Sequence, residues 1–316
     1  MLGSRTMLLQ SSLMLGTLLI AGCKQYVIEV ELTPDGGGTR TIELSMTSIG
    51  EKRYEPTIDE LRRLFWVTDE AGWKLEWQEG EDGEKTPLFT KTAKTPTVSG
   101  WREMSGDLRI SGTLESDSPH QAEFTNVIRA ERETTKAGTA FTYRETLTWS
   151  GLQEAAVDFL VDRFWYELKP AFPDLGETES AELRGLLAGY VSTRLQLFFE
   201  DQDDDDGPRQ ELVTLAQEAK TIIEGEYQEV QLWTIYDILE WVLKDTGDVT
   251  TRFLEKELPG VHLASYTDLV LKVAMPGEIV DTNADEIKGG RAIWNRGILD
   301  ALWEPVEFYV RSKTES

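Results

Sequence analysis

The sequence predicts an α+β fold, in which both ends of the chain form an antiparallel β-sheet domain and the middle forms an acidic all-helical insertion. Apolar and polar residues alternate in stretches before residue 150 and after residue 258, which is the period of a half-buried strand. Between these parts, apolar residues recur at three- and four-residue spacing, as on one face of a helix. The charge follows the same division, because residues 151–257 hold 25 acidic and 9 basic residues in a chain of formal net charge −25.

The first 22 residues have the layout of a secretory signal. A single charged residue, Arg5, precedes an uncharged and largely apolar run that is too short for a convincing membrane span. The run ends in Ile20-Ala21-Gly22-Cys23, which resembles the bacterial lipoprotein signal (the lipobox). This resemblance implies a diacylglycerol on Cys23, cleavage before it and acylation of the new N-terminus, so acyl chains would hold the mature protein to a membrane. An ordinary signal peptide cleaved near a cysteine is the alternative.

The mature chain opens with a predicted β-rich part, residues 23–150. Alternation over 26–32 and 40–46, on either side of the turn residues 33–38, predicts a β-hairpin. A short helix from Thr57 comes next, and then strands separated by a polar connection over 79–100. Further strands are predicted at 73–77, 108–110, 124–129 and 141–149. In the last of these, Glu145 lies on an otherwise apolar face. A functional carboxylate is one interpretation, and a solvated sheet edge is the one we favour.

The helical insertion spans residues 151–257, and the sheet domain resumes over 258–316. Apolar spacing predicts five helices in the insertion, at 152–168, 180–200, 208–224, 229–244 and 248–258. The final part predicts strands at 269–275, 291–294 and 306–310. Both strand-rich ends are expected to pair with each other, which makes the helical block an insertion.

Two stretches at opposite ends resemble the LppM-type family of bacterial lipoproteins. The first is Cys23 followed by Tyr26-Val27-Ile28-Glu29-Val30 and the turn 34–39, and the second is 275–285 with a tryptophan after a Gly-Gly turn. The resemblance implies an envelope lipoprotein with an antiparallel sheet and helices, in a family associated with binding envelope lipids and not with catalysis. It also marks a ligand-binding or structural motif made of Pro276, Gly277, Asn283 and Trp294.

No catalytic constellation stands out, so we predict no catalytic residue, no cofactor and no metal ligand. The two histidines, His120 and His262, lack the spacing of a zinc site, and Cys23 is the only cysteine. The acidic run 201–206 does not fit a calcium-binding EF-hand loop in either possible frame, because position twelve is Leu212 or Val213 and not glutamate. We interpret this run as a solvated linker, with adventitious divalent-cation binding as the alternative.

The aromatic content offers two interpretations. The chain has 10 tryptophans, and several precede the helical insertion. They could line a sugar- or lipid-binding face, but core packing in a fold without disulfides is the interpretation we favour. The residues in question are Trp66, Trp73, Trp77, Trp101 and Trp149.

Together these observations predict a non-catalytic, membrane-anchored protein of the cell envelope that binds an apolar or lipid-like ligand. A structural module that docks an envelope protein through the helical insertion, without a small-molecule site, is the alternative. The acidic surface argues against a nucleic-acid partner. We place the protein on the periplasmic face and slightly favour the outer membrane, because Lys24 is not the aspartate associated with inner-membrane retention.

Overall fold

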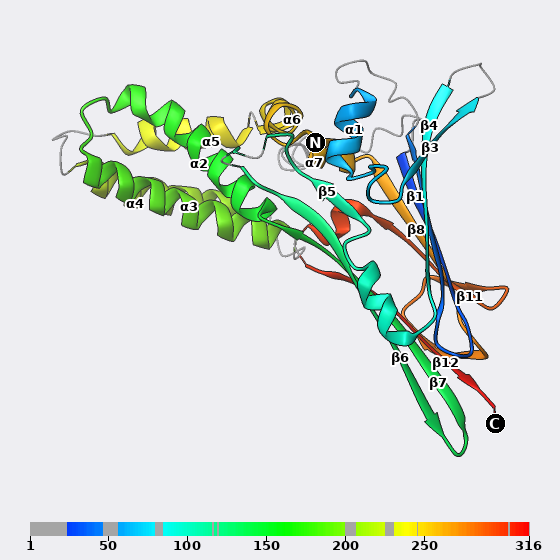
Figure 1. The fold of residues 1–316 in the computed structure, drawn as a ribbon. Coiled ribbons are helices and arrows are strands. Elements are labelled where there is room, and N and C mark those ends of the chain that lie inside the picture. The colour runs from blue at the N-terminus through cyan, green and yellow to red at the C-terminus, as the bar shows by residue number, and fades with distance from the viewer. Residues whose placement is uncertain are drawn as a thin grey trace, which may run out of the picture. The chain divides into compact units, whose positions relative to one another are not determined.

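A computed structural model describes residues 24–46, 56–79, 85–115, 117–118, 120–199, 207–224, 231–244, 246–302 and 304–315. Cys23 and the acidic run 201–206 lie outside these ranges, so the signal peptide, the lipid anchor and cation binding by the run stay predictions. The fold class is confirmed, because the described chain combines helices with two mostly antiparallel sheets. These elements are shown in Figure 1.

The chain forms two compact units. The first, which we call the helical unit, is Gln153–Leu254, and the second, the sheet unit, is made of residues 24–152 together with Glu255–Ser316. The helical unit contains α2 (Leu152–Ala171), α3 (Glu177–Phe199), α4 (Gly207–Ile223), α5 (Leu232–Lys244) and most of α6 (Thr246–Glu257).

The larger sheet of the sheet unit has seven strands in the order β10-β11-β8-β1-β2-β4-β3. Their bounds are β1 Lys24–Leu32, β2 Gly38–Met46, β3 Lys74–Glu79, β4 Lys85–Thr95, β8 Thr267–Ala274, β10 Glu286–Lys288 and β11 Arg291–Gly297. β1 and β2 form the predicted hairpin. β1 also pairs in parallel with β8, so strands from both ends of the chain lie side by side in the middle of the sheet.

The second sheet has five strands in the order β5-β6-β7-β12-β9. Their bounds are β5 Arg109–Ser111, β6 Glu123–Thr135, β7 Gly138–Ser150, β9 Glu278–Thr282 and β12 Val306–Thr314. The unit is completed by α1 (Ile58–Leu64), α7 (Pro259–Ala264) and the short 3-10 helices η1 (Val98–Met104) and η2 (Ile298–Ala301).

The core of the sheet unit lies between the inner faces of the two sheets. Trp294 of β11 packs on Phe308 of β12, with ring centroids 5.6 Å apart, and Trp101 of η1 packs edge-on against Tyr143 of β7 at 5.9 Å. Burial of such large apolar side chains contributes roughly 1.5–3 kcal/mol each. Core packing therefore accounts for Trp73, Trp101 and Trp149, which are buried, but not for Trp66 and Trp77, which are exposed.

Two predictions about strands are wrong. The supposed polar connection over 79–100 contains β4, an eleven-residue strand rich in Thr and Lys, which pairs with β2 on one side and with β3 on the other. The supposed solvated edge at Glu145 is also wrong, because β7 lies between β6 and β12 and Glu145 is fully buried. In both cases the position of the strand between two partner strands decided the outcome, and local composition did not.

The helical unit leaves the sheet unit and returns to it at neighbouring points. Gly151, where the chain leaves the sheet unit, has a positive φ. It lies so close to the loop before β6 that a Cβ there would be 2.2 Å from the Gln121 carbonyl oxygen. On the return, the Gly260 N–H donates to the Gly112 carbonyl (2.9 Å), and the Gly112 N–H donates to the Ala122 carbonyl (2.7 Å). Within the sheet unit, Gly151 therefore lies beside residues 121–122, and Gly260 lies beside Gly112, which is itself bonded to Ala122.

Candidate functional site

The sequence-predicted motif lies entirely in the sheet unit, around β12. The Pro276 carbonyl accepts a hydrogen bond from the buried Ser312 hydroxyl at 2.6 Å. Gly277 adopts φ +79, and a Cβ there would lie 2.1 Å from the Lys313 carbonyl oxygen, so only glycine fits this close approach. Pro276 and Gly277 thus turn the chain between β8 and β9 tightly against the end of β12.

Asn283 and Trp294 complete the motif and contact each other directly. The Asn283 Oδ1 accepts from the Trp294 Nε1 at 2.9 Å and from the Tyr309 backbone N–H at 2.8 Å. Its Nδ2 donates to the Glu307 carbonyl at 2.8 Å, and the Trp294 ring is fully buried. These side-chain bonds join the chain after β9 to β11 and β12. The geometry suits the structural alternative for the motif, while ligand binding by it stays a prediction.

A second polar cluster, which the sequence reasoning missed, lies buried between the two sheets. Arg40 of β2 forms a bidentate ion pair with Glu145 of β7, with Nη2 to Oε1 at 2.7 Å and Nη1 to Oε2 at 2.8 Å. The Tyr143 hydroxyl donates to Glu145 Oε2 (2.7 Å), and the Asn126 Nδ2 donates to Oε1 (2.7 Å). Neither Arg40 nor Glu145 has any exposed side-chain surface.

The electrostatic environment of this cluster keeps Arg40 charged and the Tyr143 hydroxyl protonated. Burial alone would lower the pKa of Arg40, but the facing Glu145 carboxylate and Tyr143 outweigh burial and leave that pKa above its ordinary value. Burial, and then the neighbouring carboxylate, raise the pKa of the Tyr143 hydroxyl well above its usual range. Arginine stays charged and the phenol stays protonated, so the cluster acts as a fixed clamp between the sheets.

The helical unit carries the surface features from which we build a candidate site. On α2, Val161, Phe164 and Leu168 are buried at helical spacing. A second stripe, with the same spacing, faces outward: Asp162, Trp165, Tyr166 and Lys169. Tyr166 is 71% exposed. The helix ends just beyond Pro170, which has no N–H to donate to the Tyr166 carbonyl.

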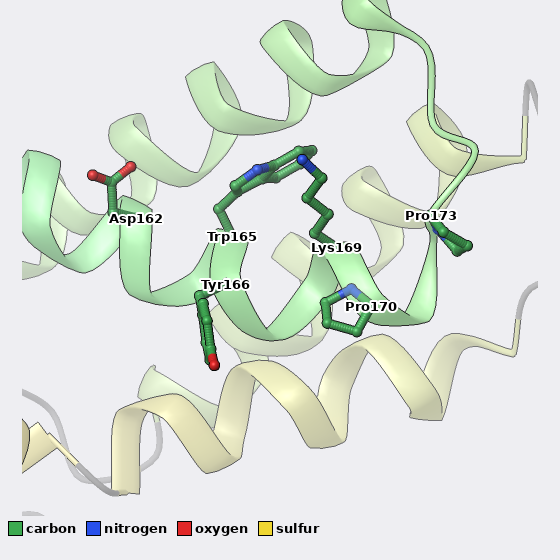
Figure 2. A pocket seen from close by; sticks show the side chains of 6 residues that line it. All are labelled: Asp162, Trp165, Tyr166, Lys169, Pro170 and Pro173. Atoms are coloured by element: carbon green, nitrogen blue, oxygen red, sulfur yellow. The ribbon is translucent and has the colours of Figure 1, made fainter.

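Two adjoining grooves flank this outward stripe. The first has a volume of about 540 Å³, and Figure 2 shows the side chains that line it: Asp162, Trp165, Tyr166, Lys169, Pro170 and Pro173. The second, of about 480 Å³, shares Trp165, Lys169 and Pro173 and extends to the start of α3. In Figure 2 the Trp165 and Lys169 side chains lie together on one side of α2, and Tyr166 points away from them.

Charged contacts fix the walls of the grooves. Arg184 of α3 forms an ion pair with Asp162 of α2, and its guanidinium lies 5.8 Å from the Trp165 ring centroid. The Arg163 guanidinium, also on α2, lies 4.8 Å from the ring centroid of Trp241 on α5, and neither residue lines a groove. Cation–π contacts of this kind contribute about 0.5–1 kcal/mol at exposed sites. Trp165 and Trp241 therefore each have a guanidinium near the ring, and Trp165 is half-buried while Trp241 is exposed.

The helical unit exposes two further aromatic side chains on α5, Trp233 and Trp241. They are eight residues apart, about two helical turns, and Asp237 lies exposed between them. Among the residues of this helix whose burial the structure describes, Ile235, Leu239 and Val242 are buried apolar residues. The sequence already indicated exposed aromatic residues here, because α5 has more aromatic and apolar side chains than one buried helix face can accommodate.

Metal binding and membrane insertion each have a structural signature: a cluster of ligating side chains for the first, a long apolar helix for the second. In the residues that the structure describes, no three His, Cys, Asp or Glu side chains come together as metal ligands would. None of the described helices combines the length and the apolar character needed to cross a membrane.

Comparisons with known proteins add little. No protein-family model matches the chain, and no curated protein matches it. Among solved structures, it is similar to the NMR structure of the folded domain of the Mycobacterium tuberculosis LppM protein, with 9% sequence identity, 95% of each chain covered and a TM-score of 0.31. A TM-score this low does not establish a shared fold, so membership in the LppM-type family stays a prediction.

Proposed function

We propose that this chain is a non-catalytic, lipid-anchored protein of the bacterial cell envelope, whose acidic helical unit docks a basic segment of a partner protein. The observation that carries the docking role is the pair of open grooves on α2 and α3, lined by aromatic and proline side chains. Exposed aromatic residues supply much of the binding energy in protein interfaces. Docking is the function that the described geometry supports best.

The chemistry of the partner is set by charge. Residues 151–257, which include the helical unit, carry 25 acidic and 9 basic residues. Of the basic side chains in the grooves, Arg184 is already paired with Asp162. A segment with Lys or Arg beside apolar residues would complement both the field and the aromatic surface, and the field would mainly speed its association.

The anchor rests on the lipobox and on the position of β1. Cys23 is the chain's only cysteine, and β1 begins at the next residue. Acyl chains on this cysteine would hold the protein to the periplasmic face of a membrane, with the outer membrane slightly favoured. The measurement is the intact mass of protein extracted with detergent from its native membrane, beside a Cys23→Ser form. Added acyl mass that is lost in the Ser form supports the anchor, whereas an unmodified wild-type chain contradicts it.

The docking role is tested by photo-crosslinking in native membranes. The photoreactive residue p-benzoylphenylalanine replaces Tyr166, which projects from the groove, and in a control chain it replaces the exposed Val127 of the sheet unit. We expect a protein adduct at position 166 and none at 127, with the crosslinked peptide rich in Lys and Arg. The yield should fall at high ionic strength, because salt screens the attraction.

A variant pair makes the test specific to the groove. Trp165→Ser removes the ring shared by both grooves, and Trp233→Ser removes an exposed ring from α5. We expect the adduct yield to fall several-fold in the first and to stay unchanged in the second. An adduct that is unaffected by Trp165→Ser, or one with a peptide that lacks basic residues, would contradict the proposal.

A small apolar or lipid-like ligand is the second candidate. The volume of about 540 Å³ of the first groove lies in the range of small-molecule sites, and its walls are largely apolar. The same crosslinking experiment separates the two candidates. Lipid crosslinked at position 166, in place of protein, would favour the ligand and count against docking.

A further inference from the structure

Three exposed aromatic side chains of the sheet unit remain without a role. Trp77 is 54% exposed, Trp66 43% and Tyr266 41%. They come from three separate parts of the chain: strand β3, the residue after the C-cap of α1, and the residue before β8. We call these three residues the aromatic rim. Aromatic side chains such as these suit a boundary between an apolar and a wet environment, because the ring is apolar and the Trp and Tyr tips are polar.

The strand register places two of them at the end of the sheet where the chain enters from the lipobox. Lys24, the first residue of β1, pairs with Thr267, so Tyr266 lies one residue further along the same end. Lys24 also pairs with Met46 of β2. On the other side of β2, Ser45 pairs with Leu88 of β4, so the next residue of β2, Met46, lies level with Pro87. Pro87 in turn pairs with Trp77 of β3. Trp77 therefore lies level with Lys24, three strands away across the sheet.

Trp66 lies at the same end. Its neighbour Phe65 packs on Tyr26, two residues after Lys24, with ring centroids 6.3 Å apart. Figure 1 shows α1 beside the end of the sheet at which β1 and β8 begin, opposite to the β1–β2 turn. Trp66 also adopts φ +52, a left-handed conformation that glycine takes without strain at this position after a helix. A bulky side chain held there exposes its ring, with Arg109 stacked on one face at 3.6 Å.

The distance to the anchor is fixed by covalent geometry. In the sequence Cys23 directly precedes Lys24, the first residue of β1, and the Cα atoms of consecutive residues are about 3.8 Å apart. Side chains level with Lys24 are then held at the membrane surface whenever Cys23 is anchored. Trp and Tyr are the residues that favour the headgroup region, because their rings are apolar and their tips are polar.

We propose that the aromatic rim seats the sheet unit on the lipid surface of the membrane that holds Cys23, with Trp66, Trp77 and Tyr266 in the headgroup region. The inference rests on the lipid anchor of the proposed function and adds an orientation to it. The occupant is a phospholipid surface and not a protein, because the anchor brings that surface to the rim. Binding should not depend on anionic lipid, since the chain carries a formal net charge of −25.

The test uses the mature acylated protein, with its mass verified, reconstituted in phosphatidylcholine vesicles. Brominated acyl chains quench tryptophans that lie in the bilayer. We expect brominated vesicles to quench part of the wild-type fluorescence and expect Trp66→Phe/Trp77→Phe to reduce the quenched part by at least about twofold. Trp233→Phe/Trp241→Phe, which removes two exposed tryptophans of the helical unit, is the matched control and should keep the quenching.

Each other outcome has a defined meaning. An acylated protein with no quenching, or with equal quenching in both double variants, overturns the rim and leaves the anchor intact. Quenching lost only in the Trp233/Trp241 variant would place α5 in the lipid and also overturn the rim. Quenching that grows when anionic phosphatidylglycerol is included contradicts seating by aromatic contacts alone. A chain without acyl mass overturns the anchor itself and, with it, the rim.

Discussion

At the scale of single residues, the Arg40–Glu145 pair shows where sequence reasoning stopped. From the sequence alone, the glutamate within the alternating pattern of β7 was interpreted as solvated. Its partner, Arg40, could not be recognised, because it is 105 residues away and belongs to the other sheet. Only the fold brings a guanidinium and a phenol to it. Removing one partner of such a buried pair generally costs about 3–5 kcal/mol, because the other charge is left unpaired.

Two buried tyrosines give opposite predictions for the same substitution. The Tyr26 hydroxyl is buried without a hydrogen-bond partner in the described part of the chain, whereas the Tyr143 hydroxyl bonds both Glu145 and Arg40. We expect Tyr26→Phe to raise the free energy of unfolding by about 1 kcal/mol and Tyr143→Phe to lower it by about 1.5–3 kcal/mol. Urea unfolding of the two variants beside wild type checks both signs, and equal effects would contradict these assignments.

At the scale of elements, local periodicity predicted α1 to α6 and the first hairpin well, but not the short helix α7. The predicted helix at 152–168 appears as Leu152–Ala171, and the one at 208–224 as Gly207–Ile223. A helix is stabilised by contacts three and four residues apart, so its signal is written locally. β4 was missed because Thr and Lys give no clear alternation, and its stability comes from β2 and β3 on either side. The grooves and the rim depend on the fold as a whole, and no local pattern encodes them.

The junction of β9, β11 and β12 yields a prediction at this scale. Asn283→Ala removes bonds to Trp294, Tyr309 and Glu307 and leaves the buried indole N–H without its acceptor. We expect the free energy of unfolding to fall by about 2–4 kcal/mol, mainly from the unpaired donor. Asn295→Ala, at an exposed position of β11, is the control and should change it by less than about 0.5 kcal/mol. If both variants unfold alike in urea, Asn283 does not join these strands as described.

At the scale of the whole molecule, the helical unit is predicted to be removable. Gly151 before it and Gly260 after it lie beside the neighbouring residues Ala122 and Gly112, and side chains of the two sheets pack on each other in the core of the sheet unit. Replacing residues 153–254 by a Gly/Ser linker of about eight residues, which spans roughly 16 Å, should leave the sheet unit folded.

Near-ultraviolet circular dichroism and urea unfolding check this prediction. The buried Trp101 and Trp294 should keep their tertiary signal, and unfolding should stay cooperative. A deletion variant that loses this signal while it retains secondary structure would show that the sheet unit depends on the insertion.

The parallel pairing of β1 with β8 also bears on how the chain matures. Lys24 must find Thr267, so the central strand of the larger sheet cannot be completed until most of the chain has been made and exported. Contacts this distant in sequence form slowly, whereas the helices need only near neighbours. We therefore expect the nascent protein to cross the membrane with the edge of β1 that pairs with β8 still open, whereas the local β1–β2 hairpin does not need the distant strand. Cys23 would then be accessible to the acylating and cleaving enzymes before the sheet closes next to it.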